Sequence, residues 1–260
     1  MTPFAAFRRW RAQYQLQRYA IPDALWNEAF GALPFLHGWP TTRLQKLRDL
    51  TVFFLCEKNI IGAHDFQVLP FHRVVVAMQA CVPILELGLR QYDAFQTVVL
   101  YPDEFITGAE WEDEFGVVHQ DDEAMMGEAM MGGPVVLSWP DALDPTRGAA
   151  QEGDAVPLAN VVIHEFVHQI DMRNGDANGF PELPGTVQPE RWKQVFADAY
   201  ADFSARVTAE EETEIDPYAA ESPAEFFAVI SETFFVALEM LETHYPDVAA
   251  LLMAFYRYRP

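Results

Sequence analysis

Apolar residues recur every three or four positions along most of the chain, a spacing that predicts amphipathic helices. We expect helices in the ranges 4–19, 41–58, 71–92, 157–172, 189–207, 222–242 and 246–258. A proline removes a backbone donor and disturbs the helix in front of it, so Pro83 is expected to interrupt the third range. The turn signal Asn174–Gly175 follows the fourth range. Helices therefore dominate both ends of the chain.

Two short runs in the middle of the chain have the composition of β-strands. Residues 97–102 end at a proline, and residues 135–139 lie between Gly-Pro and a second proline. The stretch 103–133 is acidic and rich in methionine and glycine, and we expect a loop there with a short hairpin near Val117. A small mixed sheet between helical ends predicts a predominantly helical α+β fold. The second strand has two interpretations, an edge that pairs with an extended substrate or an interior strand.

The chain has 39 acidic and 17 basic residues, a formal net charge of −22. Non-specific binding to nucleic acid relies on lysine and arginine, so this balance argues against it and favours basic or amine-bearing partners. Basic residues collect in the first 50 positions, whereas acidic clusters lie at 103–128 and 210–216. Such clusters are typical of solvated surface.

The length, the N-terminus and the two cysteines are typical of a cytoplasmic protein. The first 15 residues contain neither an uninterrupted apolar segment nor a small-residue cleavage site, so we expect no signal peptide. The most apolar stretch, 74–89, is too short to span a bilayer. Cys56 and Cys81 lie in apolar segments, and we expect buried free thiols. At 260 residues, the chain fits one large domain or a core with a helical extension.

Residues 164–168 read His-Glu-Phe-Val-His, an H-E-x-x-H motif. Residues i and i+4 project from the same face of a helix, one turn apart, so His164 and His168 can bind one zinc ion. Glu165 flanks that ion, where it can act as a general base toward water. The apolar residues 158–163 would bury the helix, as a preorganised metal site requires. This context argues against the structural alternative, a helix with two surface or capped histidines.

A catalytic zinc site needs a third protein ligand and one open position. Glu225 lies in the first turn of the helix expected at 222–242, and Glu232 lies two turns further along the same side. Spacing alone does not choose between these carboxylates. Ser222 and Glu225 also match a capping box, so a purely structural role of Glu225 fits the same pattern.

Two longer segments are similar to a known family. The run HEFVHQIDMRNGDANGFP at 164–181 and the run IDPYAAESPAEFFAVISETFF at 215–235 resemble the Mlc titration factor A family of bacterial zinc peptidases. The segment LRDLTVFFLCEKNIIGA at 47–63 fits the same family, and the resemblance covers roughly residues 40–240. The two core motifs are also similar to the catalytic domain of anthrax lethal factor, in which H-E-x-x-H precedes an A-E-F-F-A segment.

The resemblance implies a zincin-like peptidase core at 41–260, a helical extension at 1–40, and one zinc ion per chain. Glu225 occupies the ligand position of the A-E-F-F-A segment, so the resemblance implies that it is the third ligand. Tyr218 matches a tyrosine that helps to stabilise the transition state in the toxin. Glu232 then becomes either a carboxylate that orients a ligand or a buried structural one.

The toxin has a further acid four residues after its glutamate ligand, and Val229 stands at that position here. Asp171, three residues after His168, is a candidate for orienting a ligand, with a helix-surface acid as the equal alternative. The family also implies aminopeptidase activity on peptide substrates and binding to the transcriptional repressor Mlc. The alternative is a protein that acts mainly by sequestering that repressor. The loop at 103–133 is a candidate gate over the metal.

Overall fold

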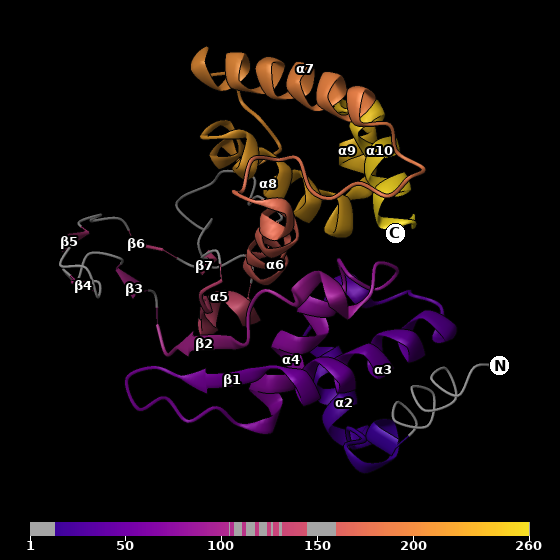
Figure 1. Cartoon of the computed structure of the whole chain (residues 1–260), viewed down its shortest axis with the longest axis vertical. Coiled ribbons are helices and arrows are strands. Elements are labelled where there is room, and N and C mark those ends of the chain that lie inside the picture. Colours follow the sequence, from indigo (N-terminus) through magenta and orange to yellow (C-terminus); the bar gives the residue numbers. More distant parts are fainter. Residues whose placement is uncertain are drawn as a thin grey trace.

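The computed structural model describes residues 14–103, 132–144 and 160–259, together with the backbone of short strands between 105 and 129 (Figure 1). Its helices are α2 (Asp23–Gly31), α3 (Thr41–Glu57), α4 (Pro70–Cys81), α5 (Trp139–Leu143), α6 (Val161–Asp171), α7 (Pro189–Thr208), α8 (Pro223–Val236), α9 (Leu238–His244) and α10 (Pro246–Tyr256). The 3-10 helices are η1 (Pro34–Leu36), η2 (Leu89–Tyr92), η3 (Met172–Asn174) and η4 (Pro217–Ala220). The mostly helical, α+β character expected from the sequence is confirmed.

The main sheet has the strand order β1 (Asn59–Gly62), β2 (Thr97–Tyr101), β8 (Val135–Ser138) and β7 (Gly127–Ala129). The first three strands are parallel and β7 is antiparallel to β8, so the sheet is small and mixed, as predicted. Both neighbours of β8 are strands of this sheet, which makes β8 an interior strand. The interpretation of residues 135–139 as a free edge for substrate is therefore wrong, because the hydrogen-bonding groups of that strand already serve the sheet.

Two smaller ladders lie between β2 and β8 in the sequence. The strand β3 (Phe105–Ile106) pairs with β6 (Ala124–Met125), and β4 (Trp111–Glu112) pairs with β5 (Val118–His119), both antiparallel. The second pair agrees with the hairpin expected near Val117, although Val117 itself lies outside the described residues.

Several helices end where the sequence indicates, and one does not. The helix expected over 71–92 stops at Cys81, just before Pro83, and the chain becomes helical again only in η2, so the expected interruption at Pro83 is confirmed. The helix expected over 222–242 is broken at Ala237, whose φ of −148° and ψ of 51° turn the chain between α8 and α9. Of the helix expected at 4–19, residues 14–18 are helical and the remainder lies outside the described part.

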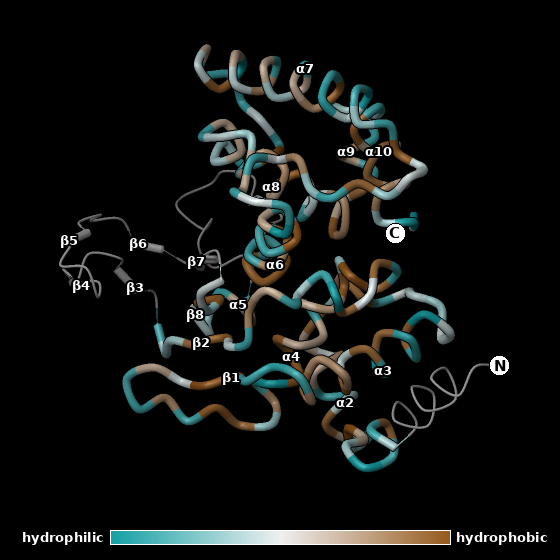
Figure 2. The backbone as a smooth tube through the Cα atoms, in the orientation of Figure 1, coloured by the Kyte–Doolittle hydropathy of each residue, from teal (hydrophilic) through white to brown (hydrophobic). Residues whose placement is uncertain are grey.

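The C-terminal helices pack through aromatic side chains. The buried positions of α7 recur at helical spacing, and Figure 2 shows the matching alternation of apolar and polar residues along that helix. Trp192 of α7 stacks on Phe196 with 4.2 Å between ring centroids and also contacts Phe227 of α8 and Phe255 of α10. This cluster holds α7, α8 and α10 together and so fixes the helix that carries Glu225.

The helix α6 lies between this C-terminal group and the part of the molecule that contains the sheet and α4 (Figure 1). Phe166 of α6 packs against Phe54 of α3 and Tyr92 of η2, with ring centroids 5.6 Å and 5.0 Å away. The prediction that this helix is buried is confirmed. Within the described part, α2 packs against α4, and the division into an extension at 1–40 and a core at 41–260 stays a prediction. No helix of that part has the length and apolarity needed to cross a membrane.

Candidate metal centre

The helix α6 presents both histidines of the motif on one face. Its N-cap is Asn160, whose side-chain oxygen accepts a hydrogen bond from Ile163 N at 2.9 Å, so the helix starts three residues before His164. The rings of His164 and His168 have centroids 4.7 Å apart, and their Nε2 atoms are 3.1 Å apart. The two nitrogens converge on a single point, as the i, i+4 spacing predicts.

The helix α8 brings Glu225 to the same point. Ser222 is its N-cap and accepts a hydrogen bond from Glu225 N at 3.1 Å, with Pro223 in the first turn. The Glu225 carboxylate lies against the imidazoles: its Oε2 is 3.0 Å from His164 Nε2 and 3.2 Å from His168 Nε2. The backbone of Glu225 thus serves the helix cap, while its side chain is available for chemistry.

The three donor atoms fit a tetrahedral metal ion. Zinc binds nitrogen and oxygen ligands at about 2.0–2.1 Å, so two ligand atoms of a tetrahedral site lie about 3.3 Å apart. The three distances here, 3.0, 3.1 and 3.2 Å, are close to that value. His164, His168 and Glu225 form the one group of potential metal ligands found among the residues that the structure describes. Two imidazole nitrogens that face each other at this distance require a proton or a cation between them.

The electrostatics of the site favour a cation. Burial opposes a charge on His164, but Glu232 and Glu225 outweigh this effect and raise the pKa of His164 well above its ordinary value. Burial alone would raise the pKa of Glu225, but hydrogen bonds to His164 and His168 hold that pKa well below its usual range. A site that stabilises a proton on His164 and a charge on Glu225 also attracts a divalent ion.

Glu232 contacts the other face of the same histidine. Its Oε1 is 2.5 Å from His164 Nδ1, and its Oε2 accepts a hydrogen bond from Asn160 N at 2.6 Å. The side chain is buried, with a relative exposure of 4% for the residue. A carboxylate on Nδ1 fixes the ring and leaves Nε2 to bind a metal, which is the usual arrangement around metal-binding histidines. Of the two carboxylates that spacing left open, Glu225 faces Nε2 and Glu232 faces Nδ1.

Glu165 is buried beside the triad of potential metal ligands, which consists of His164, His168 and Glu225, and is not part of it. Its relative exposure is 4%, and its Oε2 has no hydrogen-bond partner. Burial raises the pKa of Glu165 to about 7, although His164 and His168 act in the opposite direction. A bound dication would act in the same direction as the two histidines and lower that raised pKa. Glu165 would then be ionised near neutral pH and able to accept a proton.

Asp171 is fully buried and contacts a loop rather than a histidine. Its Oδ2 accepts hydrogen bonds from Asn178 N and Gly179 N, each at 2.7 Å. Its Oδ1 and the Nδ1 of His168 have no hydrogen-bond partner. The structure therefore shows Asp171 fastening the loop after α6, with no hydrogen bond that would orient His168. The alternative reading, a helix-surface acid, is wrong because Asp171 has 0% exposure.

Gly179 lies where this loop touches the first turn of α8. Its φ is +74°, and a Cβ added there would lie 2.4 Å from Pro223 O. Its own carbonyl accepts a hydrogen bond from Trp192 Nε1 at 3.0 Å. The loop thus sets the distance between α6 and the turn that carries Glu225.

We expect Gly179→Ala to lower the free energy of unfolding by about 1–3 kcal/mol, because the substitution combines backbone strain with a clash against a carbonyl. Urea denaturation measures this change. Gly185→Ala, in the same loop with nothing within 4 Å of the added Cβ, is the matched control and should change stability little. Equal stabilities of the two variants would contradict the assigned contact.

Tyr218 lies in η4, close to the triad. Its ring centroid is 6.0 Å from that of His164, and the residue is 42% exposed. Asp216 caps η4 by accepting a hydrogen bond from Tyr218 N at 2.9 Å, and Tyr200 OH donates to Ala220 O at 3.0 Å. These contacts hold η4 in place and keep Tyr218 beside His164.

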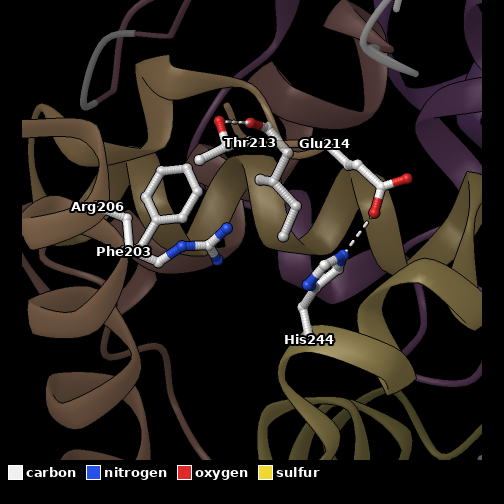
Figure 3. A pocket seen from close by; sticks show the side chains of 6 residues that line it. Phe203, Arg206, Thr213, Glu214 and His244 are labelled. Atoms are coloured by element: carbon white, nitrogen blue, oxygen red, sulfur yellow. Dashed lines mark hydrogen bonds and ion pairs between the residues drawn. The ribbon is translucent and has the colours of Figure 1, made fainter. Parts of the chain in front are cut away.

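The segment before Tyr218 is tied to the C-terminal helices. His244 Nε2 of α9 lies 2.6 Å from Glu214 Oε2, and Thr213 OH donates to Ile215 O at 2.8 Å (Figure 3). A small pocket lined by these side chains and by Arg206 and Phe203 of α7 opens here. None of His164, His168 and Glu225 lines this pocket, so it is not part of the metal centre. The contacts of Glu214 and Thr213 hold the segment in place.

Two residues at the site escape the motif-based reading. Asn160 sits at the N-cap of α6, and a helix-start signal at that position could have identified it. Gln79 is hydrogen-bonded to Asn160. The sequence feature that could have identified Gln79 is that it is the one amide side chain within the apolar run 74–82.

Known proteins resemble this chain over most of its length. The family model described as glucose-regulated metallo-peptidase M90 matches residues 7–257. A protein named Mlc titration factor A from Klebsiella pneumoniae is 34% identical over 254 residues, covering 96% of this chain and 91% of the relative. Proteins of the same name from Edwardsiella ictaluri and Escherichia coli are 35% and 33% identical over the same length, covering 92% and 91% of those relatives. The resemblance inferred from the motifs is confirmed.

Proposed function

Since the chain belongs to the glucose-regulated metallo-peptidase M90 family, we propose that this metallopeptidase is a zinc-dependent aminopeptidase with its metal on His164, His168 and Glu225. The observation that carries the proposal is the triangle of Nε2, Nε2 and Oε2 atoms with sides of 3.0–3.2 Å. Two nitrogens and one carboxylate oxygen are a typical ligand set of zinc peptidases, and the set leaves one position for reactants.

A zinc ion held there would polarise the carbonyl of the scissile peptide bond and lower the pKa of a water. Glu165 accepts a proton from that water while the water oxygen attacks the carbonyl carbon. Glu165 then passes the proton to the nitrogen of the leaving amine. The Tyr218 hydroxyl donates a hydrogen bond to the oxygen that becomes negative during the attack. Glu232 keeps His164 oriented throughout, because it holds the Nδ1 side of the ring.

The aminopeptidase assignment requires a group that holds the α-ammonium of the substrate. A carboxylate can hold an ammonium group through charge-assisted hydrogen bonds. The acidic residues between 110 and 128 are the candidates for this role. Their side chains lie outside the described residues. The large net negative charge supports a substrate with a positive end.

A panel of aminoacyl chromogenic amides tests this function when it is combined with metal analysis of the purified protein. We expect about one zinc per chain, hydrolysis of amides with a free α-amino group, and little hydrolysis of the same amides after N-acetylation. Hydrolysis of internal bonds in blocked peptides at a comparable rate would indicate an endopeptidase instead.

Tyr218→Phe should lower kcat about tenfold or more with unchanged zinc content. The loss of one donor to a developing oxyanion costs about 10²–10³ in well-enclosed sites, and the 42% exposure of Tyr218 lets water replace part of that donor. Steady-state kinetics with parallel metal analysis measure the effect. An unchanged kcat would remove Tyr218 from the reaction.

Binding to a repressor is a second candidate function, favoured by the name Mlc titration factor A of the relatives. We propose that the chain binds an Mlc-type transcriptional repressor in the cytoplasm, either beside its hydrolytic activity or in place of it. A pull-down with the Glu165→Gln variant separates these cases: sequestration survives in that variant, whereas control by proteolysis does not.

A further inference from the structure

A chain of buried hydrogen bonds leads away from the metal centre to the far side of α6. Glu232 accepts from Asn160 N at 2.6 Å, and Asn160 Nδ2 donates to Gln79 Oε1 of α4 at 2.8 Å. Gln79 Nε2 in turn donates to Ala142 O of α5 at 2.8 Å. The chain therefore connects His164 through α8, α6 and α4 to α5.

The direction of each side-chain amide in this chain is fixed by backbone groups. Ala142 O can only accept, so the NH₂ group of Gln79 must face it, and the oxygen of Gln79 must face Asn160. Ile163 N can only donate, so the oxygen of Asn160 faces the helix, and its NH₂ group faces Gln79. Both amides are thus satisfied in one orientation, and reversing either would place two donors or two acceptors together.

The burial of these polar groups is unusual for a structural role alone. Gln79 is 1% exposed, Asn160 2% and Glu232 4%, and the neighbours of Gln79 on α4 are apolar and fully buried. Burial of an amide costs free energy unless all its hydrogen bonds are made, and an apolar residue at position 79 would avoid that cost. Satisfied buried networks instead hold their members in one arrangement.

We propose that Gln79 and Asn160 are positioning residues of the metal centre. Glu232 bonds His164 with one oxygen and Asn160 N with the other, so the location of Asn160 determines where the carboxylate meets the imidazole. Gln79 holds the Asn160 side chain and, through Ala142 O, ties it to α5. The network keeps His164 Nδ1 bonded and its Nε2 directed at His168 and Glu225. The inference rests on the metal site of the proposed function.

Two variants interrupt the network at different points. Asn160→Ser keeps a side-chain oxygen for the N-cap of α6 but removes the amide that binds Gln79. Gln79→Met has a similar volume and removes the hydrogen bonds of that side chain to Asn160 and Ala142 O, together with a longer one to Val75 O. Thr233→Val is the matched control, because it removes a buried hydroxyl that bonds Val229 O at 2.9 Å on α8, next to Glu232 but outside the network.

The experiment measures the zinc dissociation constant by chelator competition and the visible spectrum of the cobalt-loaded protein for each full-length variant. We expect Asn160→Ser and Gln79→Met to bind zinc at least about tenfold more weakly than the wild type, as for other residues that support metal ligands, and to shift the cobalt bands. Thr233→Val should bind zinc within about twofold of the wild type, with an unchanged cobalt spectrum. Zinc affinities of the two network variants that match that of the control would overturn the proposal.

A second measurement needs no metal. The short contact between Glu232 and His164 should give the Nδ1 proton of His164 a far-downfield NMR signal in the metal-free wild type and in Thr233→Val. We expect this signal to shift or broaden in both network variants, and its persistence unchanged would count against the inference.

If the wild type binds zinc but cleaves no peptide, the proposed hydrolysis fails while the zinc affinities of the variants still test the network. If the wild type binds no zinc, the proton signal alone decides.

Discussion

We expect the Glu165→Gln variant to keep its zinc and to lose about 10²–10⁴-fold in kcat. Glutamine has the size of glutamate but cannot accept the proton of water, so the substitution removes the base without creating a cavity. Glu165 lies outside the group of His164, His168 and Glu225, which predicts an unchanged metal content. Its 4% exposure means that bulk water cannot easily reach the position and replace the lost base.

The control is Glu239→Gln, the same chemical change at an exposed position of α9. Its kcat should stay within about twofold of the wild type, since isolated surface substitutions have small effects. Metal analysis of both variants accompanies the kinetics. Full activity of Glu165→Gln with zinc bound would rule out the proposed base.

Glu225→Ala should abolish stoichiometric zinc binding and, with it, hydrolysis. The side chain supplies one of the three ligand atoms, and its removal leaves two imidazoles whose Nε2 atoms are 3.1 Å apart. Loss of a residue that only supports a ligand weakens metal binding by about 10–100-fold, so loss of the ligand itself should exceed 100-fold. Elemental analysis after dialysis against a weak chelator measures the result.

Glu239→Ala controls for the removal of one negative charge from this strongly acidic protein and should retain about one zinc per chain. Thermal unfolding without metal shows whether Glu225→Ala still folds. A folded Glu225→Ala protein with undiminished zinc would refute the ligand assignment.

The sequence predicted most of the helices because their apolar faces recur at the helical period. It did not predict the break at Ala237, where neither proline nor glycine marks the turn. The break follows from packing, as α9 and α10 turn back against α8. The strand β1 was also missed, because only Ile60 of its four residues is fully buried and the run is short.

The site was predictable to the extent that its residues share a helix. His164 and His168 are four residues apart, and helix geometry alone brings them together. The partner of that pair is on another helix, and no local rule gives the approach of α6 to α8. Spacing could not choose between Glu225 and Glu232, because both lie on the same side of one helix. In the structure both carboxylates contact His164, one at each ring nitrogen. The role of Gln79 depends on long-range packing of α4, which composition does not encode.

The interval between Glu225 and Glu232 has a consequence for how this protein can change. Seven residues are close to two full turns of α8, so both carboxylates meet opposite sides of one imidazole. Inserting or deleting a single residue between them would rotate one carboxylate by about 100° around the helix axis. One imidazole nitrogen would then lose its partner, whatever the new residue was. This stretch of α8 therefore has a fixed length.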